Sequence, residues 1–304
     1  MFLDGEAKRS RRIYMHSVIE ELLDGAPVLT DGAWGTELQI RGLGPGECPD
    51  IWNLLYPQRV YDVAHAYVAA GSDIILTNTF GANRFRLDES YSSRVAEINK
   101  RGVEISLQAA KNRAMVFASV GPSGKMLLNG DVTEAQLEEV FVEQTRAIAK
   151  AGADAIVVET MSDLAEAKIA VAAAKLTRLP IVACMVFDSG ACKDRTMMGE
   201  TPERVAAALA EAGADVIGSN CGQGIDGFIP ICKRLHSATK LPIWIKANAG
   251  LPELKQGAAT YSMTPKQFAT RIPELLKAGA SFVGGCCGTN PNFIHEIGAT
   301  LNIA

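Results

Sequence analysis

The sequence predicts an α/β fold, a single (β/α)8 barrel, and three observations carry this prediction. A short motif, Ala-Gly-X-Asp or Ala-Gly-Ala-Ser, recurs at residues 70–73, 151–154, 212–215 and 278–281, and an apolar run follows it each time. Eight apolar runs occur along the chain, and most do not alternate with polar residues, which is typical of parallel strands covered on both faces. Amphipathic stretches such as 134–150 lie between them.

The expected strands, in order, are Val-Leu-Thr at 28–30, Ile-Ile-Leu-Thr at 74–77, Val-Phe-Ala-Ser-Val at 116–120, Ile-Val-Val at 156–158, Ile-Val-Ala-Cys-Met-Val at 181–186, Val-Ile-Gly-Ser at 216–219, Ile-Trp-Ile-Lys-Ala at 243–247 and Phe-Val-Gly at 282–284. The intervening segments have room for a helix each. The glycine of the repeated motif is expected to end a helix and lead into a strand. An open doubly wound sheet is the alternative, but such sheets usually have fewer strands.

Composition limits the classes of partner. The chain has 304 residues, of which 48% are hydrophobic and 21% charged, so it is long and apolar enough to bury a large core. Thirty Lys and Arg against 34 Asp and Glu give a net charge of −4, which predicts no nucleic-acid partner. No apolar run approaches the ~18 residues that a membrane-spanning helix needs, so no membrane partner is expected either.

The ends and the cysteines suggest a cytoplasmic, single-domain protein. Residues 1–16 are basic but lack the apolar stretch of a secretory signal, and Met15 could equally be the natural start, so we expect a flexible leader there and a barrel over 17–304. No linker or low-complexity tract marks a second domain. Seven cysteines, two of them adjacent at Cys286 and Cys287, indicate reduced thiols rather than a disulfide framework.

Polar and thiol groups follow the predicted strands, where a barrel of this kind forms its active site. They are Asp-Gly-Ala-Trp-Gly-Thr at 31–36, Asn-Thr-Phe-Gly at 78–81, Gly-Pro-Ser-Gly at 121–124, Glu-Thr at 159–160, Asp188, Asn-Cys-Gly at 220–222, Asn-Ala-Gly at 248–250 and Cys-Cys-Gly at 286–288. We therefore expect the functional site at this rim.

Three cysteines at neighbouring strand ends predict a metal site. The sixth and eighth strands flank only the seventh, so Cys221, Cys286 and Cys287 can meet. Three thiolates with an open fourth position match a catalytic Zn²⁺ site, which would hold a substrate thiol as a nucleophilic thiolate and favour thiol alkylation over hydrolysis. Taken singly, each cysteine is more often a small core residue. The other four cysteines, Cys48, Cys184, Cys192 and Cys232, are expected to be core or surface thiols.

Two acids predict recognition of an amino acid. Asp31 and Glu159 end the first and fourth strands, where either could hold a cationic amino group, although acids at strand ends also serve as loop caps. The backbone N–H groups of Gly32 and Ala33 lie beside Asp31 in sequence and suit an anion.

Two other candidate sites are weak. The histidines His16, His65, His236 and His295 fall on predicted helices or in the leader, so structural roles are expected. Residues 222–227 read Gly-x-Gly-x-x-Gly after a strand, but the next strand ends in Lys246 instead of the acid that a dinucleotide site requires.

The chain resembles the homocysteine-binding methyltransferase family over about residues 20 to 300. The motifs are Asp-Gly-Ala-Trp-Gly-Thr at 31–36, Thr-Asn-Thr-Phe at 77–80, Glu-Thr at 159–160, Asn-Cys at 220–221, Asn-Ala-Gly at 248–250 and Gly-Gly-Cys-Cys-Gly-Thr at 284–289. The resemblance implies a (β/α)8 barrel with zinc on Cys221, Cys286 and Cys287 and the homocysteine sulfur as fourth ligand. It also implies that Asp31, Thr77 and Glu159 hold the amino acid end of homocysteine, with the Gly32 and Ala33 amides near its carboxylate.

The methyl donor is less constrained. Residues 49–54 and 195–199 look most like bacterial betaine–homocysteine methyltransferases and the N-terminal homocysteine module of methionine synthase, and the chain has no room for a cobalamin or folate domain. The resemblance thus implies betaine or a related onium donor. Thr160 stands where the animal betaine enzymes have an aromatic residue, and Cys48 stands about where they have a tryptophan, so Trp34 or Trp52 would have to attract the donor by cation–π contact.

Three questions stay open at the level of sequence. A methylated corrinoid on a separate protein is the alternative donor, with homocysteine or another thiol as acceptor. A non-catalytic zinc- or thiol-binding barrel is the alternative of another class, whereas a zinc hydrolase would need a combined set of His and Asp ligands, which is absent from the strand ends. The sequence does not decide whether the chain forms a homo-oligomer.

Overall fold

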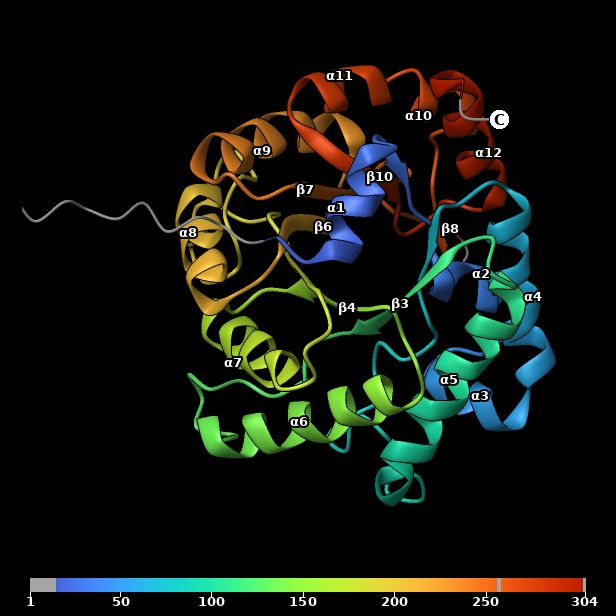
Figure 1. The fold of residues 1–304 in the computed structure, drawn as a ribbon, viewed down its shortest axis with the longest axis vertical. Coiled ribbons are helices and arrows are strands. Elements are labelled where there is room, and N and C mark those ends of the chain that lie inside the picture. Colours follow the sequence, from blue (N-terminus) through green and yellow to red (C-terminus); the bar gives the residue numbers. More distant parts are fainter. Residues whose placement is uncertain (1–14, 256–257, 303–304) are drawn as a thin grey trace, which may run out of the picture.

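The computed structural model describes residues 15–255 and 258–302, and it confirms the single (β/α)8 barrel (Figure 1). The barrel strands are β1 (Val28–Leu29), β2 (Ile74–Ile75), β3 (Met115–Val120), β4 (Ala155–Met161), β5 (Ile181–Met185), β6 (Val216–Gly224), β7 (Ile243–Asn248) and β10 (Ala280–Gly285). They pair in parallel in the order β1-β10-β7-β6-β5-β4-β3-β2. A parallel bridge between Thr30 and Ile74 joins the two ends of this order and closes the ring.

Helices surround the strands (Figure 1). They are α1 (Ser17–Asp24), α2 (Trp34–Ile40), α3 (Trp52–Leu55), α4 (Pro57–Ala69), α5 (Val95–Ala110), α6 (Glu134–Lys150), α7 (Leu164–Lys175), α8 (Pro202–Ala212), α9 (Ile225–Ala238), α10 (Pro265–Ala269), α11 (Ile272–Lys277) and α12 (Pro291–Leu301), with 3-10 turns at Pro49–Ile51 and Ser92–Arg94. Side-chain caps start several of them. Thr133 and Gln136, for example, form a capping box at the start of α6.

The repeated motif has a structural cause. Its glycines, at 71, 152, 213 and 279, all have positive φ between +93° and +110°, as expected of residues that end a helix in the left-handed conformation. Its aspartates bind the preceding strand: Asp73 accepts from Leu29 N, Asp154 from Val116 N and Asp215 from Ile181 N, at 2.7–2.8 Å. Each aspartate also donates its own N–H to the carbonyl of that same residue. The motif thus joins a helix end to the start of the neighbouring strand.

Helix α1 covers the end of the barrel at which the strands begin (Figure 1). Its Ile19 is fully buried against an interior layer that includes Val28, Phe117, Trp244 and Phe282. The leader predicted for 1–16 lies outside the described residues except at Met15 and His16. The side chain of His16 caps α1 by accepting from Val18 N at 3.3 Å.

The barrel interior is apolar at the end where the strands begin and charged at the end where they finish. The layer under α1 is apolar, and in it Trp244 stacks on Phe117 and packs at a tilt against Phe282. Toward the opposite end, where the strands finish, the interior side chains are Asp31, Glu159 and Lys246, all buried. Buried charges are costly unless they are paired, so these three side chains must pair with other protein groups or with a ligand.

A hairpin of β8 (Glu253–Lys255) and β9 (Ala258–Thr260) follows β7 and was not expected from the sequence. Strands β4 and β6 run beyond their predicted ends because a register irregularity lies within each, after Val158 and after Asn220. These two irregularities lie at the site described below.

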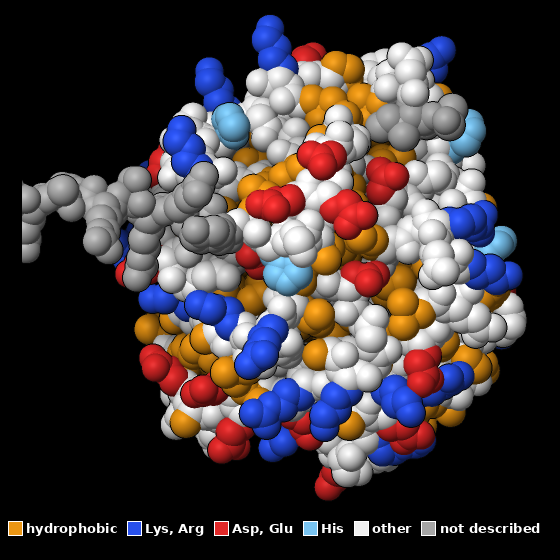
Figure 2. All heavy atoms as spheres, viewed as in Figure 1, with side chains coloured by type: hydrophobic (Ala, Val, Ile, Leu, Met, Phe, Trp, Pro, Cys, Tyr) orange, Lys and Arg blue, Asp and Glu red, His pale blue; other side chains and the backbone are white. Residues whose placement is uncertain are grey.

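The face that carries α1 has mixed charge. Acidic side chains gather near its centre, and basic and acidic side chains mix toward its edges (Figure 2). Its described residues thus form no continuous basic surface of the kind that a phosphate backbone attracts. Among the helices of residues 15–255 and 258–302, none has the length and hydropathy needed to cross a bilayer.

Candidate metal and substrate site

A cavity of about 240 Å³ opens where the barrel strands end. Its lining includes all but one of the residues predicted to form the site: Gly32, Ala33, Thr77, Glu159, Cys221, Cys286 and Cys287. Trp34, Phe80, Ser119, Thr160, Asn220 and Lys246 also contribute. The exception is Asp31, which is fully buried behind the wall.

Three thiols converge at one side of the cavity. The Sγ atoms of Cys221, Cys286 and Cys287 all lie within 4.8 Å of one another, and all three cysteines are free. Cys221 has φ +62°, so the irregular end of β6 turns its side chain out of the regular strand pattern. Backbone hydrogen bonds to β7 hold the adjacent pair, because Cys286 N donates to Ala247 O and Cys287 O accepts from Ala249 N.

The spacing fits a tetrahedral metal ion. With Zn–S bonds of about 2.3 Å, two sulfur ligands lie about 3.8 Å apart, and Cys221 Sγ is 3.8 Å from Cys287 Sγ. Hydrogen bonds from Cys286 and Cys287 lower the pKa of Cys221, whereas the same contact raises the pKa of Cys286. Three thiols this close together suit a shared cation. They would lose their protons when that cation binds.

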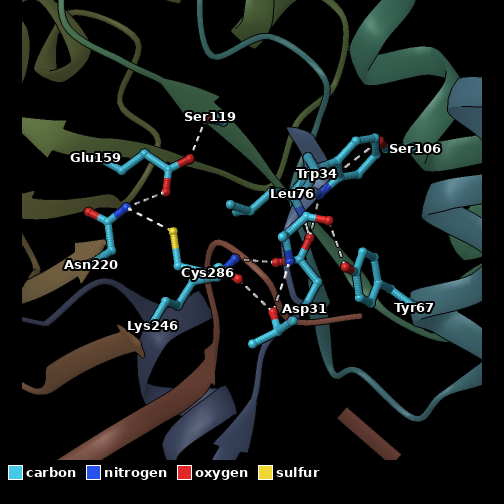
Figure 3. A network of polar contacts seen from close by, with 12 residues as sticks. Asp31, Trp34, Tyr67, Leu76, Ser106, Ser119, Glu159, Asn220, Lys246 and Cys286 are labelled. Carbon is cyan, nitrogen blue, oxygen red and sulfur yellow. Dashed lines mark hydrogen bonds and ion pairs between the residues drawn. The ribbon is translucent and has the colours of Figure 1, made fainter. Parts of the chain in front are cut away.

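Glu159 faces the cavity from the end of β4. Ser119 Oγ donates to its Oε1 at 2.5 Å and Asn220 Nδ2 donates to its Oε2 at 3.1 Å, and the residue is 8% exposed (Figure 3). Burial raises the pKa of Glu159, while the positive charge of Lys246 and the hydrogen bond from Ser119 act in the opposite direction. The carboxylate is thus oriented by two neutral donors and retains acceptor capacity for a cation.

Asn220 joins the acid to the thiol cluster, because its Nδ2 also lies 4.0 Å from Cys286 Sγ. Besides Glu159 it binds Thr160 twice, because its Oδ1 accepts from Thr160 N at 2.8 Å and its Nδ2 donates to Thr160 Oγ1 at 2.7 Å. Thr160 has φ +60°, a conformation that costs of order 1–3 kcal/mol outside glycine. Asn220 belongs to a motif visible in the sequence, but the sequence predicts no role for it.

Asp31 is committed to protein partners. Its Oδ2 accepts from Trp34 Nε1 and from Leu76 N, both at 2.7 Å, and its Oδ1 forms an ion pair with Lys246 Nζ (Figure 3). A protein ammonium, that of Lys246, therefore already lies against this carboxylate. The predicted contact between Asp31 and a substrate ammonium stays a prediction.

Lys246 is the residue that sequence reasoning missed. In the sequence, its position argues against a nucleotide site. The signal for its role is its position inside an apolar barrel strand. A lysine there is almost never buried unless it is paired, so the position indicates a buried ion pair.

The remaining expectations concern the backbone amides and Thr77. The Ala33 N–H, predicted to face a substrate carboxylate, donates instead to Thr289 Oγ1 at 3.2 Å. A side chain at Gly32 would come within 2.9 Å of both Tyr67 and Thr289, so only glycine fits there. Thr77 lines the cavity, and its hydroxyl lies 2.6 Å from Thr79 Oγ1. The substrate roles of these residues stay predictions.

The two tryptophans differ. Trp34 lines the cavity, whereas Trp52 does not: it is 3% exposed, and the guanidinium of Arg59 lies 5.1 Å from its ring centroid. Trp34 alone of the two can meet a ligand in this cavity.

The histidines and the other cysteines lie elsewhere, as predicted. His65, His236 and His295 are exposed on α4, α9 and α12, and none lines the cavity. Cys184 and Cys232 are buried in the core, Cys192 is exposed, and Cys48 is half-buried outside the cavity lining.

Fold and site together define a (β/α)8-barrel protein with a cluster of three cysteines, spaced as metal ligands are, beside a cavity lined by Glu159 and Lys246. The family model for homocysteine S-methyltransferase matches residues 28–301, so the chain belongs to that family.

Individual relatives agree with this assignment. The chain is 30% identical over 301 residues to the methionine synthase of Mycobacterium tuberculosis and 29% identical to that of Mycobacterium leprae, but it spans only 25% of the length of either. Among solved structures, it is similar to the homocysteine methyltransferase MmuM from Escherichia coli in its metallated form. That match has a TM-score of 0.75 and 23% identity, and covers 92% of this chain and 99% of MmuM.

Proposed function

We propose that this chain is a zinc-dependent homocysteine S-methyltransferase that converts homocysteine to methionine. The observation that carries the proposal is the convergence of three cysteine sulfurs, within 4.8 Å of one another, on the same cavity as Glu159 in a member of this family. Cys221, Cys286 and Cys287 would hold the ion. A reducing compartment, the cytoplasm, suits a site whose thiols must stay reduced.

The metal, when bound, supplies the positive charge that keeps a fourth thiol deprotonated and nucleophilic near neutral pH. The rest of the work belongs to the protein. Glu159 would bind the ammonium group of homocysteine, and Ser119 and Asn220 hold the carboxylate of Glu159 in place for that contact. Thr77 lies in the same wall and would add a hydroxyl contact.

An onium compound such as betaine is the donor that the cavity supports best. Trp34 lines the cavity and its Nε1 donates to Asp31, so the orientation of its ring is set before a ligand arrives. A ring in this position would attract a methylated cation. A thiolate that attacks an onium methyl group neutralises two opposite charges, which a cavity poor in water favours.

A methylated corrinoid carried by a separate protein is the second candidate donor. The observation in its favour is the 30% identity to a methionine synthase of which this chain spans only a quarter.

Turnover with a panel of donors tests the proposal. The zinc-loaded protein would be incubated with homocysteine and, in turn, betaine, S-methylmethionine, S-adenosylmethionine and methylcobalamin, and methionine would be measured by mass spectrometry. Methionine formation with at least one donor is expected. Zinc and homocysteine binding without turnover on any donor would instead indicate a non-catalytic thiol-binding barrel.

A further inference from the structure

Lys246 contributes a positive charge to the wall of the substrate cavity. It lies near the end of β7, its side chain is 3% exposed, and it lines the cavity while its partner Asp31 does not. A lysine ammonium has three N–H donors. Within the described part of the chain, Asp31 Oδ1 is the one acceptor that Lys246 Nζ contacts. Two donors are therefore available to a ligand.

Neighbouring carboxylates keep this ammonium charged. Burial acts to lower the pKa of Lys246, but Asp31 and Glu159 outweigh burial and raise the pKa above its usual value. Asp31 lies behind the cavity wall, so the charged groups among the lining residues are the Lys246 ammonium and the Glu159 carboxylate. The wall thus presents one positive and one negative group, which is the charge pattern of an amino acid zwitterion in reverse.

The alternative site for a substrate carboxylate, the backbone amides after β1, already makes a hydrogen bond within the protein. The Gly32 and Ala33 amides were the expected partners of a substrate carboxylate, but the Ala33 N–H donates to Thr289 Oγ1 at 3.2 Å. A charged ammonium also makes a stronger bond to a carboxylate than a neutral amide does. Lys246 is therefore the better placed partner.

We propose that Lys246 binds the carboxylate of the thiol substrate while Glu159 binds its ammonium, so that Lys246 is a specificity-determining residue that selects thiols carrying a carboxylate. This inference rests on the proposed function and deepens it. It differs from a purely structural role, in which Lys246 serves only to neutralise the buried Asp31.

Truncated substrates separate the two roles. Calorimetry on the zinc-loaded enzyme would compare homocysteine with 3-mercaptopropylamine, which lacks the carboxylate, and with 4-mercaptobutyrate, which lacks the ammonium. We expect the wild type to bind 3-mercaptopropylamine about ten- to a hundredfold more weakly than homocysteine, the range for one charge-assisted hydrogen bond. Lys246→Met should weaken homocysteine by a similar factor and leave 3-mercaptopropylamine unchanged or tighter, because a repelling charge is removed.

Glu159→Gln is the matched control. It should show the converse pattern, with weaker binding of homocysteine and no loss for 4-mercaptobutyrate. Because Lys246→Met leaves Asp31 buried without its counter-charge and could unfold the barrel, the double variant Asp31→Asn/Lys246→Met removes both charges and is tested in the same way. The double variant is expected to prefer homocysteine over 3-mercaptopropylamine no more than Lys246→Met does.

Two results would overturn the inference. One is equal weakening of homocysteine and 3-mercaptopropylamine by the substitution, which would assign Lys246 a structural role. The other is a wild type that binds both thiols equally. Failure of the proposed function looks different, because a zinc-loaded wild type that binds no thiol, or makes no methionine, fails before any variant is compared.

Discussion

Asn220 donates its side-chain amide to Glu159 Oε2 at 3.1 Å, so the residue immediately before Cys221 holds the acid at the end of β4. The proposed ammonium site and the proposed metal site are thereby positioned by neighbouring residues of one strand. A disturbance at Asn220 should reach both.

Asn220→Ala is therefore expected to weaken homocysteine binding about tenfold, since Glu159 loses one of its two side-chain donors and the left-handed Thr160 loses its partner. Zinc affinity should fall as well. Ser119→Ala is the matched control, because it removes the other donor to Glu159 from β3 and should leave zinc affinity unchanged. Calorimetry and competition with a zinc chelator measure the two effects. Wild-type affinities for both ligands in Asn220→Ala would contradict this account.

Cys286→Ala should lose zinc and activity together while the barrel stays folded. The physical reason is that two remaining thiolates do not make a tight tetrahedral site. Metal analysis and circular dichroism check the two parts. Cys192→Ser, at an exposed thiol outside the cavity, should retain stoichiometric zinc. Full activity in metal-free protein would show that the thiol cluster has another purpose.

Glu159→Gln should weaken homocysteine binding by about 1.5–3 kcal/mol, the range for a hydrogen bond to a charged group. Glu166→Gln is a suitable comparison, because Glu166 is also buried and binds a backbone N–H, that of Ser123, but does not line the cavity. Its dissociation constant for homocysteine should stay within about twofold of the wild type. An unchanged constant in Glu159→Gln would make Glu159 a loop cap only.

The affinity for homocysteine should depend on the protonation of Glu159. Burial raises the pKa of this carboxyl, and only the deprotonated form pairs with an ammonium group. Affinity is thus complete above the raised pKa and falls as pH decreases through it, starting at a higher pH than for an exposed glutamate with a pKa of about 4.3. Titration calorimetry at a series of pH values, with zinc content checked at each, measures this. Parallel curves for the wild type and Glu159→Gln would assign the dependence to another group.

Methyl transfer should proceed by one direct displacement. Homocysteine should release close to one proton per site on binding near pH 7, because its thiol would otherwise stay largely protonated. Calorimetry in buffers of different ionisation enthalpy measures that proton. A chiral methyl group should then emerge inverted, and no histidine of the described chain lines the cavity to act as a base. Retained configuration would require a methyl-enzyme intermediate.

Local pattern was enough to predict the architecture. The eight apolar runs and the four helix-ending glycines specify strands and their connections, because hydrophobic periodicity and backbone conformation are properties of neighbouring residues. The rule that barrel sites form at strand ends then brought Cys221, Cys286 and Cys287 together without any measured distance. The structure places their sulfurs as that reasoning expected.

Tertiary structure decided which charged and polar side chains of the barrel interior pair with one another. Asp31 and Lys246 are 215 residues apart, and each lies near the end of a strand of similar composition to its neighbours, so nothing local pairs them. Asn220 likewise reaches Glu159 and Thr160 only because β6 lies within side-chain reach of β4 across β5. The sequence by itself indicated most of the side chains that reach the cavity, with Asp31 and Lys246 as the exceptions. Closure of the barrel decided which of them neutralise one another and which stay free for a ligand, because a buried charge takes the nearest opposite charge in space, whatever its distance along the chain.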